Sequence, residues 1–335
     1  MATGRDGHGL SSPRVAIVGC GLMGRWHAEY STRAGGEVVA LVDPEPSSTA
    51  ALGRRFPTAQ RYGDDAEWLN AAGADVVHVC TPTPSHVALA SQALAAGCHV
   101  LVEKPLAPSH DECARLLETA AAQGLRLAAV HQFPFQRGVR ELCRRSRRLG
   151  RVVEVTHRIH SAGGDDLDPD ARRRTLVEML PHAVSLFHAL GLETPARAWT
   201  VLRSDADRLD LAAAADSAQL RVAFSLTSRP TRNELVVAGS EATATADLFH
   251  GFVTWERGRV TRRDKILLPF RRATDQLGRA GINLLWRAVR RQPAYPGLPE
   301  LIAAFYQSFD GAREPAVSPA EILSASTLQD LVAEA

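Results

Sequence analysis

A glycine-rich turn directly follows the first apolar segment of the chain. Residues 15–18 (Val-Ala-Ile-Val) have the pattern of a buried parallel strand and lead into Gly19, Cys20, Gly21, Leu22, Met23 and Gly24. In a strand–turn–helix unit, the first glycine allows a tight turn, the second lets the backbone approach a phosphate, and the third lets the helix pack on the strand. The free N–H groups at the helix N-terminus attract an anion. The turn therefore predicts a site for the pyrophosphate of a nicotinamide cofactor, with an ordinary glycine-rich loop as the alternative.

Asp43 stands at the end of the expected second strand, residues 37–42. A carboxylate at this position can accept hydrogen bonds from the adenosine ribose hydroxyls, whereas a 2′-phosphate would meet a like charge. The following residues, Pro44, Glu45 and Pro46, supply no arginine to offset that charge. We therefore expect NAD rather than NADP. An ordinary turn or cap aspartate is the alternative interpretation.

The first part of the chain alternates between strand and helix patterns. We expect strands at 15–18, 37–42, 75–80, 99–102 and 125–130, with helices after Gly24 and at 47–56, 85–97 and 108–124. Ser109 and Glu112 have the spacing of a capping box at the start of the last of these helices. This alternation predicts an α/β Rossmann domain with a doubly wound parallel sheet, residues 13–132, after a flexible tail at 1–12.

The second part has a different pattern. Strands are expected at 151–160, 196–203, 217–228, 233–238, 242–247 and 252–256, and helices at 134–148, at 174–190 and near the C-terminus. Clustered strands at hairpin-like spacing predict an α+β domain with a mostly antiparallel open sheet, residues 133–335.

Composition limits the classes of partner. The chain has 335 residues and a formal charge of +2, so no global field draws it to nucleic acid. The five cysteines, Cys20, Cys80, Cys98, Cys113 and Cys143, are odd in number and fit no disulfide framework. The sequence also shows no signal peptide and no apolar run of membrane-spanning length. We therefore expect a cytoplasmic protein.

Glu103, Lys104 and Pro105 follow the expected strand 99–102 directly. Ligands of doubly wound sheets bind in the crevice beyond the strand ends, so these side chains are candidates for a site. A lysine there can hydrogen-bond a substrate oxygen and stabilise negative charge on it, and a cis bond before Pro105 would fix its direction. Taken alone, this tripeptide is also common on protein surfaces.

Three segments together are more specific. The glycine turn, the run Thr81-Pro-Thr-Pro-Ser-His86, and residues 96–106 (Ala-Gly-Cys-His-Val-Leu-Val-Glu-Lys-Pro-Leu) resemble the Gfo/Idh/MocA family of NAD(P)-dependent oxidoreductases, which includes glucose-fructose oxidoreductase and inositol dehydrogenase. The resemblance implies that Thr81, Pro82 and His86 line the nicotinamide side, that Glu103 approaches the nicotinamide ribose, and that Lys104 faces cofactor and substrate. It also implies a second-domain sheet that forms a substrate wall and the interface of a homodimer or homotetramer.

The family usually has an aspartate followed four residues later by a histidine, on a helix that faces the nicotinamide. This chain offers Glu178 and His182, which would share one helix face and could converge on a substrate hydroxyl. Glu178 replaces the expected aspartate, Pro181 the usual glycine, and Ser185 stands where many members have a second aspartate.

A second departure follows the last Rossmann strand, where the family often has Arg-Phe-x-x-Pro. Pro134 stands at the arginine position and Arg137 at the proline position. Gln132 and His160 are further candidates for the substrate pocket, and a structural role fits each of them equally well.

The resemblance implies hydride transfer at a CH–OH group of a sugar, cyclitol or nucleotide-sugar derivative, with Lys104 and His182 in the acid/base site, Glu178 beside them, and no metal. Two alternatives stay open. Some relatives use bound NAD transiently to cleave glycosides, and others bind NAD without catalysis and act as regulators.

Residues 257–291 hold eleven Lys/Arg and two Asp. Ile282, Leu285, Trp286 and Val289 recur at helical spacing, so the segment predicts a basic amphipathic helix. We expect it to pack on the second domain or on another subunit. A phosphate-recognising arm and a membrane-surface helix are the alternatives.

Overall fold

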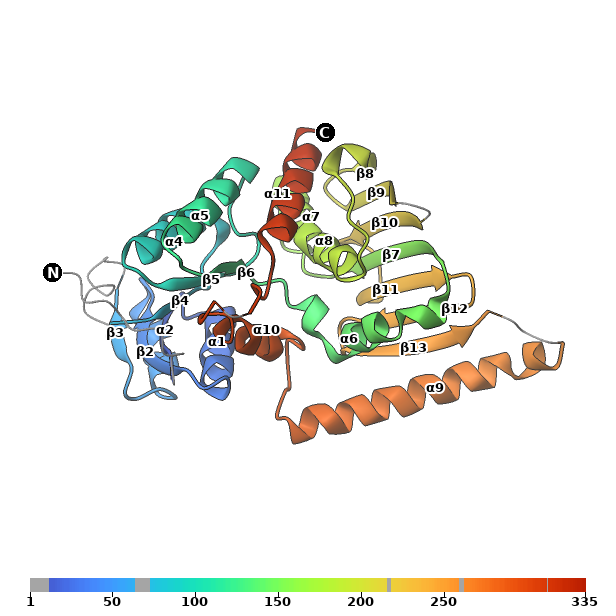
Figure 1. Ribbon diagram of the computed structural model, residues 1–335, viewed down its shortest axis with the longest axis horizontal. Coiled ribbons are helices and arrows are strands. Elements are labelled where there is room, and N and C mark those ends of the chain that lie inside the picture. Colours follow the sequence, from blue (N-terminus) through green and yellow to red (C-terminus); the bar gives the residue numbers. More distant parts are fainter. Residues whose placement is uncertain (1–11, 64–72, 216–217, 259–261, 312) are drawn as a thin grey trace. The chain divides into compact units, whose positions relative to one another are not determined.

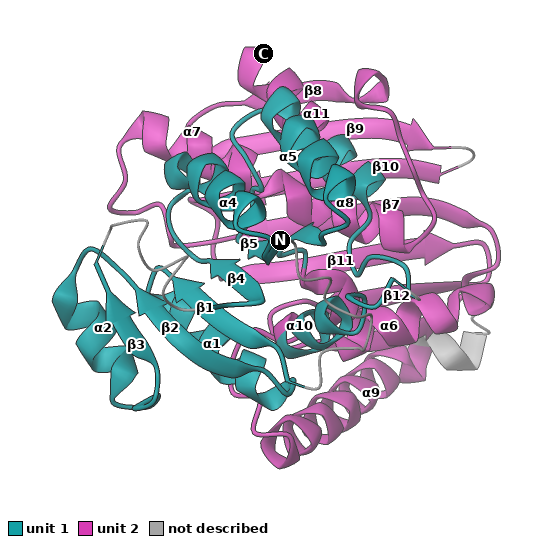
Figure 2. Cartoon of the chain, turned by 60° about the vertical axis from the view of Figure 1, so that its left-hand side comes forward, with its two compact units in different colours: residues 1–131, 299–326 teal, residues 132–298, 327–335 magenta. Residues whose placement is uncertain are grey.

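The computed structural model describes residues 12–63, 73–215, 218–258, 262–311 and 313–335, so the expected tail lies outside the described residues except for Ser12. Contacts between Cα atoms divide the chain into two compact units (Figures 1 and 2). The first comprises residues 1–131 and 299–326, and the second comprises residues 132–298 and 327–335.

The first unit is built on a six-stranded parallel sheet in the order β3-β2-β1-β4-β5-β6. Its strands are β1 Arg14–Val18, β2 Glu37–Val42, β3 Gln60–Tyr62, β4 Val76–Val79, β5 His99–Val102 and β6 Leu127–Ala129. Its helices are α1 Leu22–Arg33, α2 Pro46–Gly53, α4 His86–Ala95, α5 His110–Ala122 and α10 Leu298–Tyr306, and a 3-10 turn, η1, spans Thr83–Ser85. This order confirms the predicted doubly wound fold, with the switch point between β1 and β4.

Two local sequence patterns of the first unit, its apolar strands and the cap of α5, predicted its structure. The strands β1, β4 and β5 are buried almost throughout, because helices cover both faces of a parallel sheet. Ser109 caps α5 by accepting a hydrogen bond from the Glu112 N–H, which confirms the N-cap half of the predicted capping box. The Glu112 carboxylate accepts at 2.8 Å from the Ser109 hydroxyl, whereas a complete capping box uses the Ser109 N–H. The strand β3 was not predicted, because its three residues are polar and no apolar run marks them.

Residues 299–326 join the first unit, whereas the sequence analysis assigned them to the second domain. Three contacts hold them there. The Arg126 guanidinium donates to the Ser308 carbonyl at 2.9 Å, the rings of His99 and Phe309 stack at 4.0 Å, and the His131 imidazole lies 2.5 Å from the Glu321 carboxylate. These contacts join residues far apart in the sequence, so no local sequence pattern could predict them.

The second unit is built on a seven-stranded sheet in the order β13-β12-β11-β7-β10-β9-β8. Its strands are β7 Val152–His160, β8 Thr200–Ser204, β9 Arg208–Ala215, β10 Ala218–Ser225, β11 Arg232–Gly239, β12 Ala242–Asp247 and β13 Phe252–Arg257. Its helices are α6 Arg137–Arg144, α7 Pro169–Glu178, α8 Leu180–Ala189 and α9 Arg262–Val289, and α11 Pro319–Glu334 crosses the boundary between the units. Only β7 and β10 pair in parallel, so the sheet is mostly antiparallel, as predicted.

Three predicted elements of the second unit differ in detail. Residues 134–148 form two 3-10 turns, Phe133–Phe135 and Ser146–Leu149, around the shorter helix α6. Residues 196–203 begin with a 3-10 turn at Ala196–Ala198. The strand β9 was missed because its sequence ends in four alanines, which have little strand preference. Its inward residues, from Leu209 onward, are nevertheless buried in the core.

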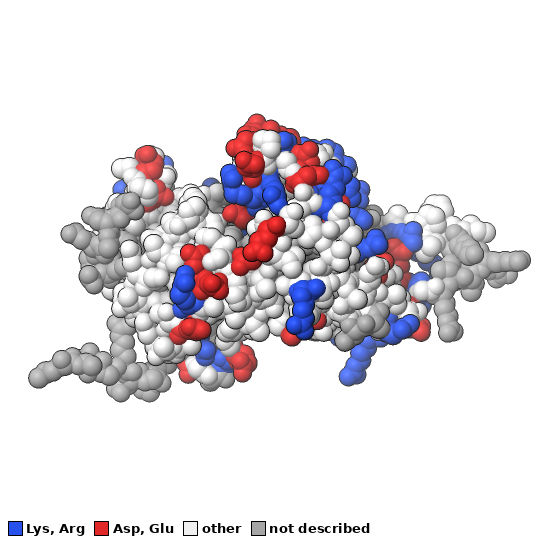
Figure 3. Space-filling model, turned by 90° about the horizontal axis from the view of Figure 1, so that it is seen from above, with Lys and Arg blue, Asp and Glu red and all other residues white. Residues whose placement is uncertain are grey.

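The described helices include none that is long and apolar enough to cross a membrane. Lys/Arg and Asp/Glu side chains are interspersed on the face drawn in Figure 3, and large areas of that face are uncharged. This distribution agrees with the small net charge of the chain.

One buried histidine makes the stability of the second unit depend on pH. His157 lies on the core side of β7, where the rings of Phe133 and Phe224 meet its imidazole edge-on, and its Nε2 bonds the Asn233 side chain at 2.9 Å. Burial lowers its pKa to about 4, and the bond to Asn233 opposes this only partly. Because the folded pKa lies below the unfolded value of 6.5, the unfolded chain takes up a proton first as the pH falls.

We therefore predict that His157 makes the free energy of unfolding about 2 kcal/mol smaller at pH 5 than at pH 7. The variant His157→Gln keeps an amide that can bond Asn233 but does not titrate, so its unfolding free energy should change less over this range. Urea unfolding of both proteins at the two pH values measures the difference. Equal pH dependence in both proteins would show that His157 is not the group responsible.

Candidate functional site

The glycine turn has three glycines with three different surroundings. Gly19 has φ +91°, and a Cβ there would lie 2.7 Å from the Cys80 carbonyl oxygen. A Cβ on Gly24 would lie 1.8 Å from the Gly19 carbonyl oxygen, which is the close approach of helix to strand that the motif predicts. A Cβ on Gly21 would meet no protein atom within 4 Å. The space beside Gly21 is therefore open to a ligand, as a pyrophosphate site requires.

The start of α1 is suited to an anion. Gly21 caps the helix without a side-chain hydrogen bond, and the first turn contains no acidic residue. The N–H groups of this turn and the positive end of the helix dipole therefore remain available to a phosphate.

Asp43 follows β2 directly, where the sequence placed it. Its Oδ2 accepts a hydrogen bond from the Cys20 N–H at 2.7 Å, and its Oδ1 accepts one from the Glu45 N–H at 2.9 Å. These bonds orient the carboxylate, and each oxygen keeps a further lone pair that can accept from a ribose hydroxyl. Glu45 lies close by and caps α2 through Ser47, so the surroundings are acidic, which disfavours a 2′-phosphate.

His86 joins two loops at the carboxyl edge of the sheet. Its Nδ1 lies 2.7 Å from the Pro105 carbonyl oxygen, and its Nε2 lies 2.8 Å from that of Thr81. Both partners are acceptors, so a neutral ring can donate to only one of them at a time. The side chain is buried. His86 therefore fixes the spacing between the Thr81-Pro82 segment and the residues after β5.

Glu103 and Lys104 follow β5, and the Lys104–Pro105 peptide bond is cis. The Glu103 side chain turns inward: Oε1 lies 3.1 Å from Nε2 of His27, and Oε2 accepts from the Lys104 N–H at 3.3 Å. Burial alone would raise the pKa of Glu103. The hydrogen bond and charge of His27 and the charge of Lys104 outweigh burial, so its pKa lies below the usual value. Glu103 is therefore held as a carboxylate.

A buried chain of hydrogen bonds extends from Glu103 through the unit. Nδ1 of His27 lies 2.9 Å from Nδ1 of His78, and Nε2 of His78 lies 3.1 Å from the Tyr306 hydroxyl. Burial lowers the pKa of His78 and raises that of Tyr306, so both groups are neutral. A single proton must lie between the two Nδ1 atoms.

Two proton arrangements satisfy this chain. With His27 neutral, Tyr306 donates to His78, His78 donates to His27, and His27 donates to Glu103. With His27 doubly protonated, it donates to both Glu103 and His78, and His78 donates to the Tyr306 oxygen. In both arrangements Glu103 accepts from His27. The sequence analysis missed this chain, although a histidine in the middle of the apolar strand 75–80 was a visible signal.

The second unit carries the other candidates. His182 is 9% exposed, and its ring lies against that of Phe133 with the centroids 4.3 Å apart. Gln132 is similarly buried and directly precedes Phe133. The close approach of Gly297, which has φ +93°, to the Gln132 carbonyl oxygen leaves no room for a Cβ at Gly297. The backbone at Gln132 is therefore closely packed, and His182 of α8 packs on the ring of the next residue, Phe133.

The sequence analysis expected Glu178 and His182 on one continuous helix, but the structure has them on two. Glu178 ends α7, Met179 separates the helices, and His182 lies in the first turn of α8. Pro181 explains the break, because it lacks an N–H and its ring crowds the carbonyl four residues earlier. The i,i+4 argument therefore does not place the two side chains on one face. Ser185 donates to the His182 carbonyl at 3.0 Å, within α8.

His160 lies apart from His182. Successive residues of β7 point to opposite faces of the sheet, and Val155, His157 and Ile159 face the core on the side of α8. His160 points to the other face and lines a cavity of about 610 Å³ together with Glu154, Arg158 and Ser225. The structure therefore does not bring His160 to the candidate site. Arg137 is also elsewhere, with its guanidinium 5.4 Å from the Trp286 ring.

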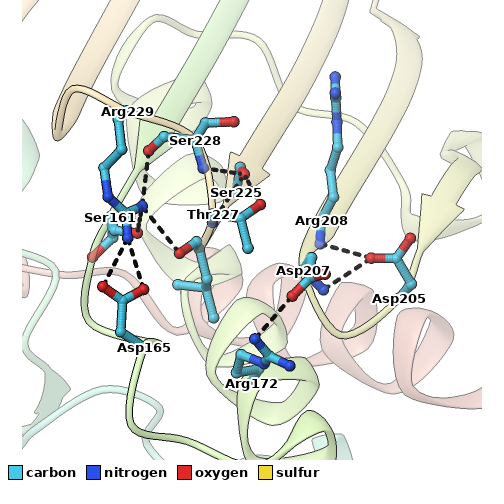
Figure 4. A network of polar contacts seen from close by, with 11 residues as sticks. Ser161, Asp165, Arg172, Asp205, Asp207, Arg208, Ser225, Thr227, Ser228 and Arg229 are labelled. Atoms are coloured by element: carbon cyan, nitrogen blue, oxygen red, sulfur yellow. Dashed lines mark hydrogen bonds and ion pairs between the residues drawn. The ribbon is translucent and has the colours of Figure 1, made fainter.

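A polar network fixes the segment between β7 and α7 (Figure 4). Arg229 donates to both carboxylate oxygens of Asp165, at 2.7 and 2.9 Å, and to the Ser161 carbonyl at 3.1 Å. Arg172 of α7 pairs at 3.2 Å with Asp207, which lies in the turn before β9. Both contacts to Asp165 come from one guanidinium nitrogen of Arg229, and charge-assisted hydrogen bonds of this kind are stronger than neutral ones. The network therefore ties the start of α7, and the α7–α8 break beyond it, to the end of the sheet.

Comparison with known proteins gives a family match for the first unit of the chain. Residues 13–131 match the model of the family described as an oxidoreductase family with an NAD-binding Rossmann fold, Gfo/Idh/MocA. This match confirms the resemblance for residues 13–131. The chain spans about half the length of the curated relatives with which it aligns first.

The relatives are named dehydrogenases. Inositol 2-dehydrogenase of Burkholderia multivorans (strain ATCC 17616 / 249) is 34% identical over 158 residues, which are 45% of this chain and 47% of the relative. D-glucoside 3-dehydrogenase of Escherichia coli (strain K12) is 40% identical over 121 residues, 35% of this chain and 34% of the relative. The WlbA dehydrogenase of Bordetella pertussis, solved with NADH and UDP-GlcNAcA, superposes with a TM-score of 0.74 at 19% identity, covering 96% of this chain and 95% of that chain. The last comparison shows that both units share its fold.

The glycine surroundings predict opposite consequences for two substitutions. Gly24→Ala places a methyl group against the Gly19 carbonyl and should destabilise the first unit, because helix and strand cannot move apart without losing packing. Gly21→Ala meets no protein atom, so the protein should unfold at an unchanged temperature but bind NADH at least tenfold more weakly. Thermal unfolding and NADH fluorescence titration measure the two effects. Unchanged NADH affinity of the Gly21 variant would contradict the phosphate site.

Tyr306→Phe tests the buried chain. The change leaves Nε2 of His78 without its partner in either proton arrangement, which costs about 1–3 kcal/mol for a buried polar group. Urea unfolding should show a loss of this size, whereas the control Tyr62→Phe, at the edge strand β3, should change stability little. If both variants are equally stable, the chain does not contribute to folding.

Proposed function

We propose that this protein is an NAD-dependent oxidoreductase that transfers a hydride between nicotinamide and a secondary alcohol or ketone carbon. The observation that carries the proposal is the placement of three motifs at one edge of one sheet. The glycine turn follows β1, Thr81 follows β4, and Lys104 follows β5, all at carboxyl ends beside the switch point. Ligands of this fold bind at that edge, and the family of this domain consists of NAD-binding oxidoreductases.

The residues have separate roles in the proposed reaction. The glycine turn and Asp43 hold NAD, which supplies the hydride-accepting carbon when bound. Lys104 stabilises the negative charge that develops on the substrate oxygen. His182 takes the hydroxyl proton during oxidation and returns it during reduction. Glu178 keeps a place beside them only through the family resemblance, because it ends α7 whereas His182 lies in α8. Gln132 contacts a further hydroxyl group. His160 has no part in this proposal, because it faces the opposite side of its sheet from His182.

We propose a sugar, cyclitol or nucleotide-sugar derivative as the substrate. The relatives are named for inositol and a D-glucoside, and the similar structure contains UDP-GlcNAcA. These compounds share a ring with several secondary alcohols. A lysine, a histidine and an amide are suited to such a ring, because each can hydrogen-bond a different hydroxyl group.

We further propose that the protein is a cytoplasmic homodimer or homotetramer. All five cysteines are free, which fits a reducing compartment. The face of the second-unit sheet that carries Glu154, Arg158 and His160 is the candidate interface, because charges of both signs, including Asp210 and Arg221, alternate on it. Analytical ultracentrifugation of the wild type tests this assembly, and a monomer at micromolar concentration would contradict it.

The activity is tested with a panel of cyclitols, free sugars and nucleotide sugars, followed by NADH absorbance. With the best substrate, Lys104→Met and His182→Asn should each lower turnover about a hundredfold or more while the affinity for NADH persists. The control His188→Asn changes a histidine on the same helix that pairs with Glu193 instead, and should retain activity.

Two results would contradict the proposal. Full turnover in both the Lys104 and the His182 variants would remove their assigned roles. Cleavage of a glycoside without net NADH production would assign the protein to the glycoside-cleaving class instead. Analysis of the products by mass spectrometry distinguishes that result from simple oxidation.

A further inference from the structure

The helix α9 has two unlike sides. It runs beside β13, the edge strand of the second-unit sheet, and is the long orange helix of Figure 1. One side is bonded to its own unit. Asn283 donates to the His250 carbonyl at 2.9 Å, and Arg279 pairs with Glu141 at 3.1 Å and with Asp275 at 2.8 Å. Trp286 lies between the guanidinium groups of Arg137 and Arg290. This side explains how the helix is attached.

The opposite side is apolar and exposed. Ile266, Phe270, Leu277 and Leu284 follow one another at spacings of four or seven residues, so they form one stripe along the helix, and each is about 70% exposed or more. Ala273 and Ala288 lie on the same stripe and are exposed as well. Among the described residues, eight of the thirteen exposed large hydrophobic side chains belong to α9: four form this stripe, and Leu267, Ile282, Leu285 and Val289 lie off it. Single exposed hydrophobic residues are ordinary, but a concentration on one helix marks an interaction surface.

Charge identifies the partner. From Ile266 to Arg291 the chain has six arginines and one acidic residue, Asp275, which is paired on the attached side. Arg271 and Arg272 lie towards one end of the helix, where Arg272 pairs with Glu256, and Arg287, Arg290 and Arg291 lie towards the other. Arg287 donates to neutral backbone carbonyls of its own unit and so keeps its full charge. Two copies of α9 packed on this stripe would bring like charges together in either direction, which disfavours a second copy of the chain. A lipid surface with anionic headgroups has charges of the opposite sign above an apolar interior.

The cavity beneath the helix does not offer a competing anion site. It has a volume of about 400 Å³ and is lined by residues of α6, β13 and α9. Its lining has three arginines, Arg137, Arg145 and Arg279, and two carboxylates, Glu141 and Asp275. Arg145 and Arg279 pair with these carboxylates, and Arg137 lies against the Trp286 ring, so each arginine already has a partner within the unit.

We propose that the outward stripe of α9, defined by Ile266, Phe270, Leu277 and Leu284, binds an anionic lipid surface. The helix lies along the plane of the surface. Its apolar side chains enter the boundary between headgroups and acyl chains, and the arginines towards the two ends of the helix supply a positive potential that attracts the lipid phosphates. This surface is separate from the residues proposed for hydride transfer.

Vesicle co-sedimentation of the full chain tests the proposal. The wild type should sediment with vesicles of phosphatidylcholine containing 30 mol% phosphatidylglycerol and at least tenfold less with phosphatidylcholine alone, and 0.5 M salt should weaken binding because it screens the charges. Leu277→Glu should lower the partition coefficient at least tenfold. Leu167→Glu, at an exposed leucine of the segment between β7 and α7, is the matched control and should bind as the wild type does.

Arg290→Glu separates the role of charge, because it should lower binding to the anionic vesicles but change binding to neutral ones little. Thermal unfolding confirms that each variant is folded, and Phe270→Ser repeats the apolar test at a second position. Three outcomes would overturn the proposal: no binding to anionic vesicles, equal binding by the Leu277 and Leu167 variants, or a change from dimer to monomer in the Leu277 variant without vesicle binding. The last outcome would assign the stripe to a second copy of the chain.

Discussion

The cofactor half of the molecule depends on the close approach of Gly24 to the Gly19 carbonyl oxygen. This contact sets where α1 begins relative to β1, and so directs the free N–H groups of the helix over the carboxyl edge of the sheet. The Asp43 carboxylate holds the same turn from the other side through the Cys20 N–H. A side chain at Gly24 would force helix and strand apart, and one at Gly19 would clash with the Cys80 carbonyl that follows β4. Backbone packing therefore creates the anion site before any charged side chain contributes.

Parts of the fold were predictable where a local pattern has one physical cause. The strands β1, β4 and β5 were found because burial on both faces demands continuous apolar residues. The strand β9 was missed because alanine has no strong strand preference, and its alternation appears only once its partners are known. The return of residues 299–326 to the first unit could not be predicted, since it rests on long-range contacts such as Arg126 with Ser308.

The same distinction applies to the candidate site. The glycine turn and Asp43 are local, and the structure has both where the sequence put them. The chain from Glu103 through His27 and His78 to Tyr306 comes from four separate segments, so only the polar residue within an apolar strand hinted at it. Its effect is on Glu103, which accepts from His27 in both proton arrangements. Because Glu103 directly precedes Lys104, this buried chain also restrains the backbone from which the proposed catalytic lysine extends.

The basic helix α9 can both pack on its own unit and present a surface for lipid. The sequence analysis set packing on the second domain against attachment to a membrane surface, as though one helix could serve only one of them. The structure separates the two sides: Asn283 and Arg279 attach α9 to its own unit, while the stripe from Ile266 to Leu284 stays exposed. Attachment fixes the rotation of the helix about its axis, and a fixed rotation keeps the apolar stripe facing outward. Packing on one side is therefore what makes a defined docking surface on the other side feasible.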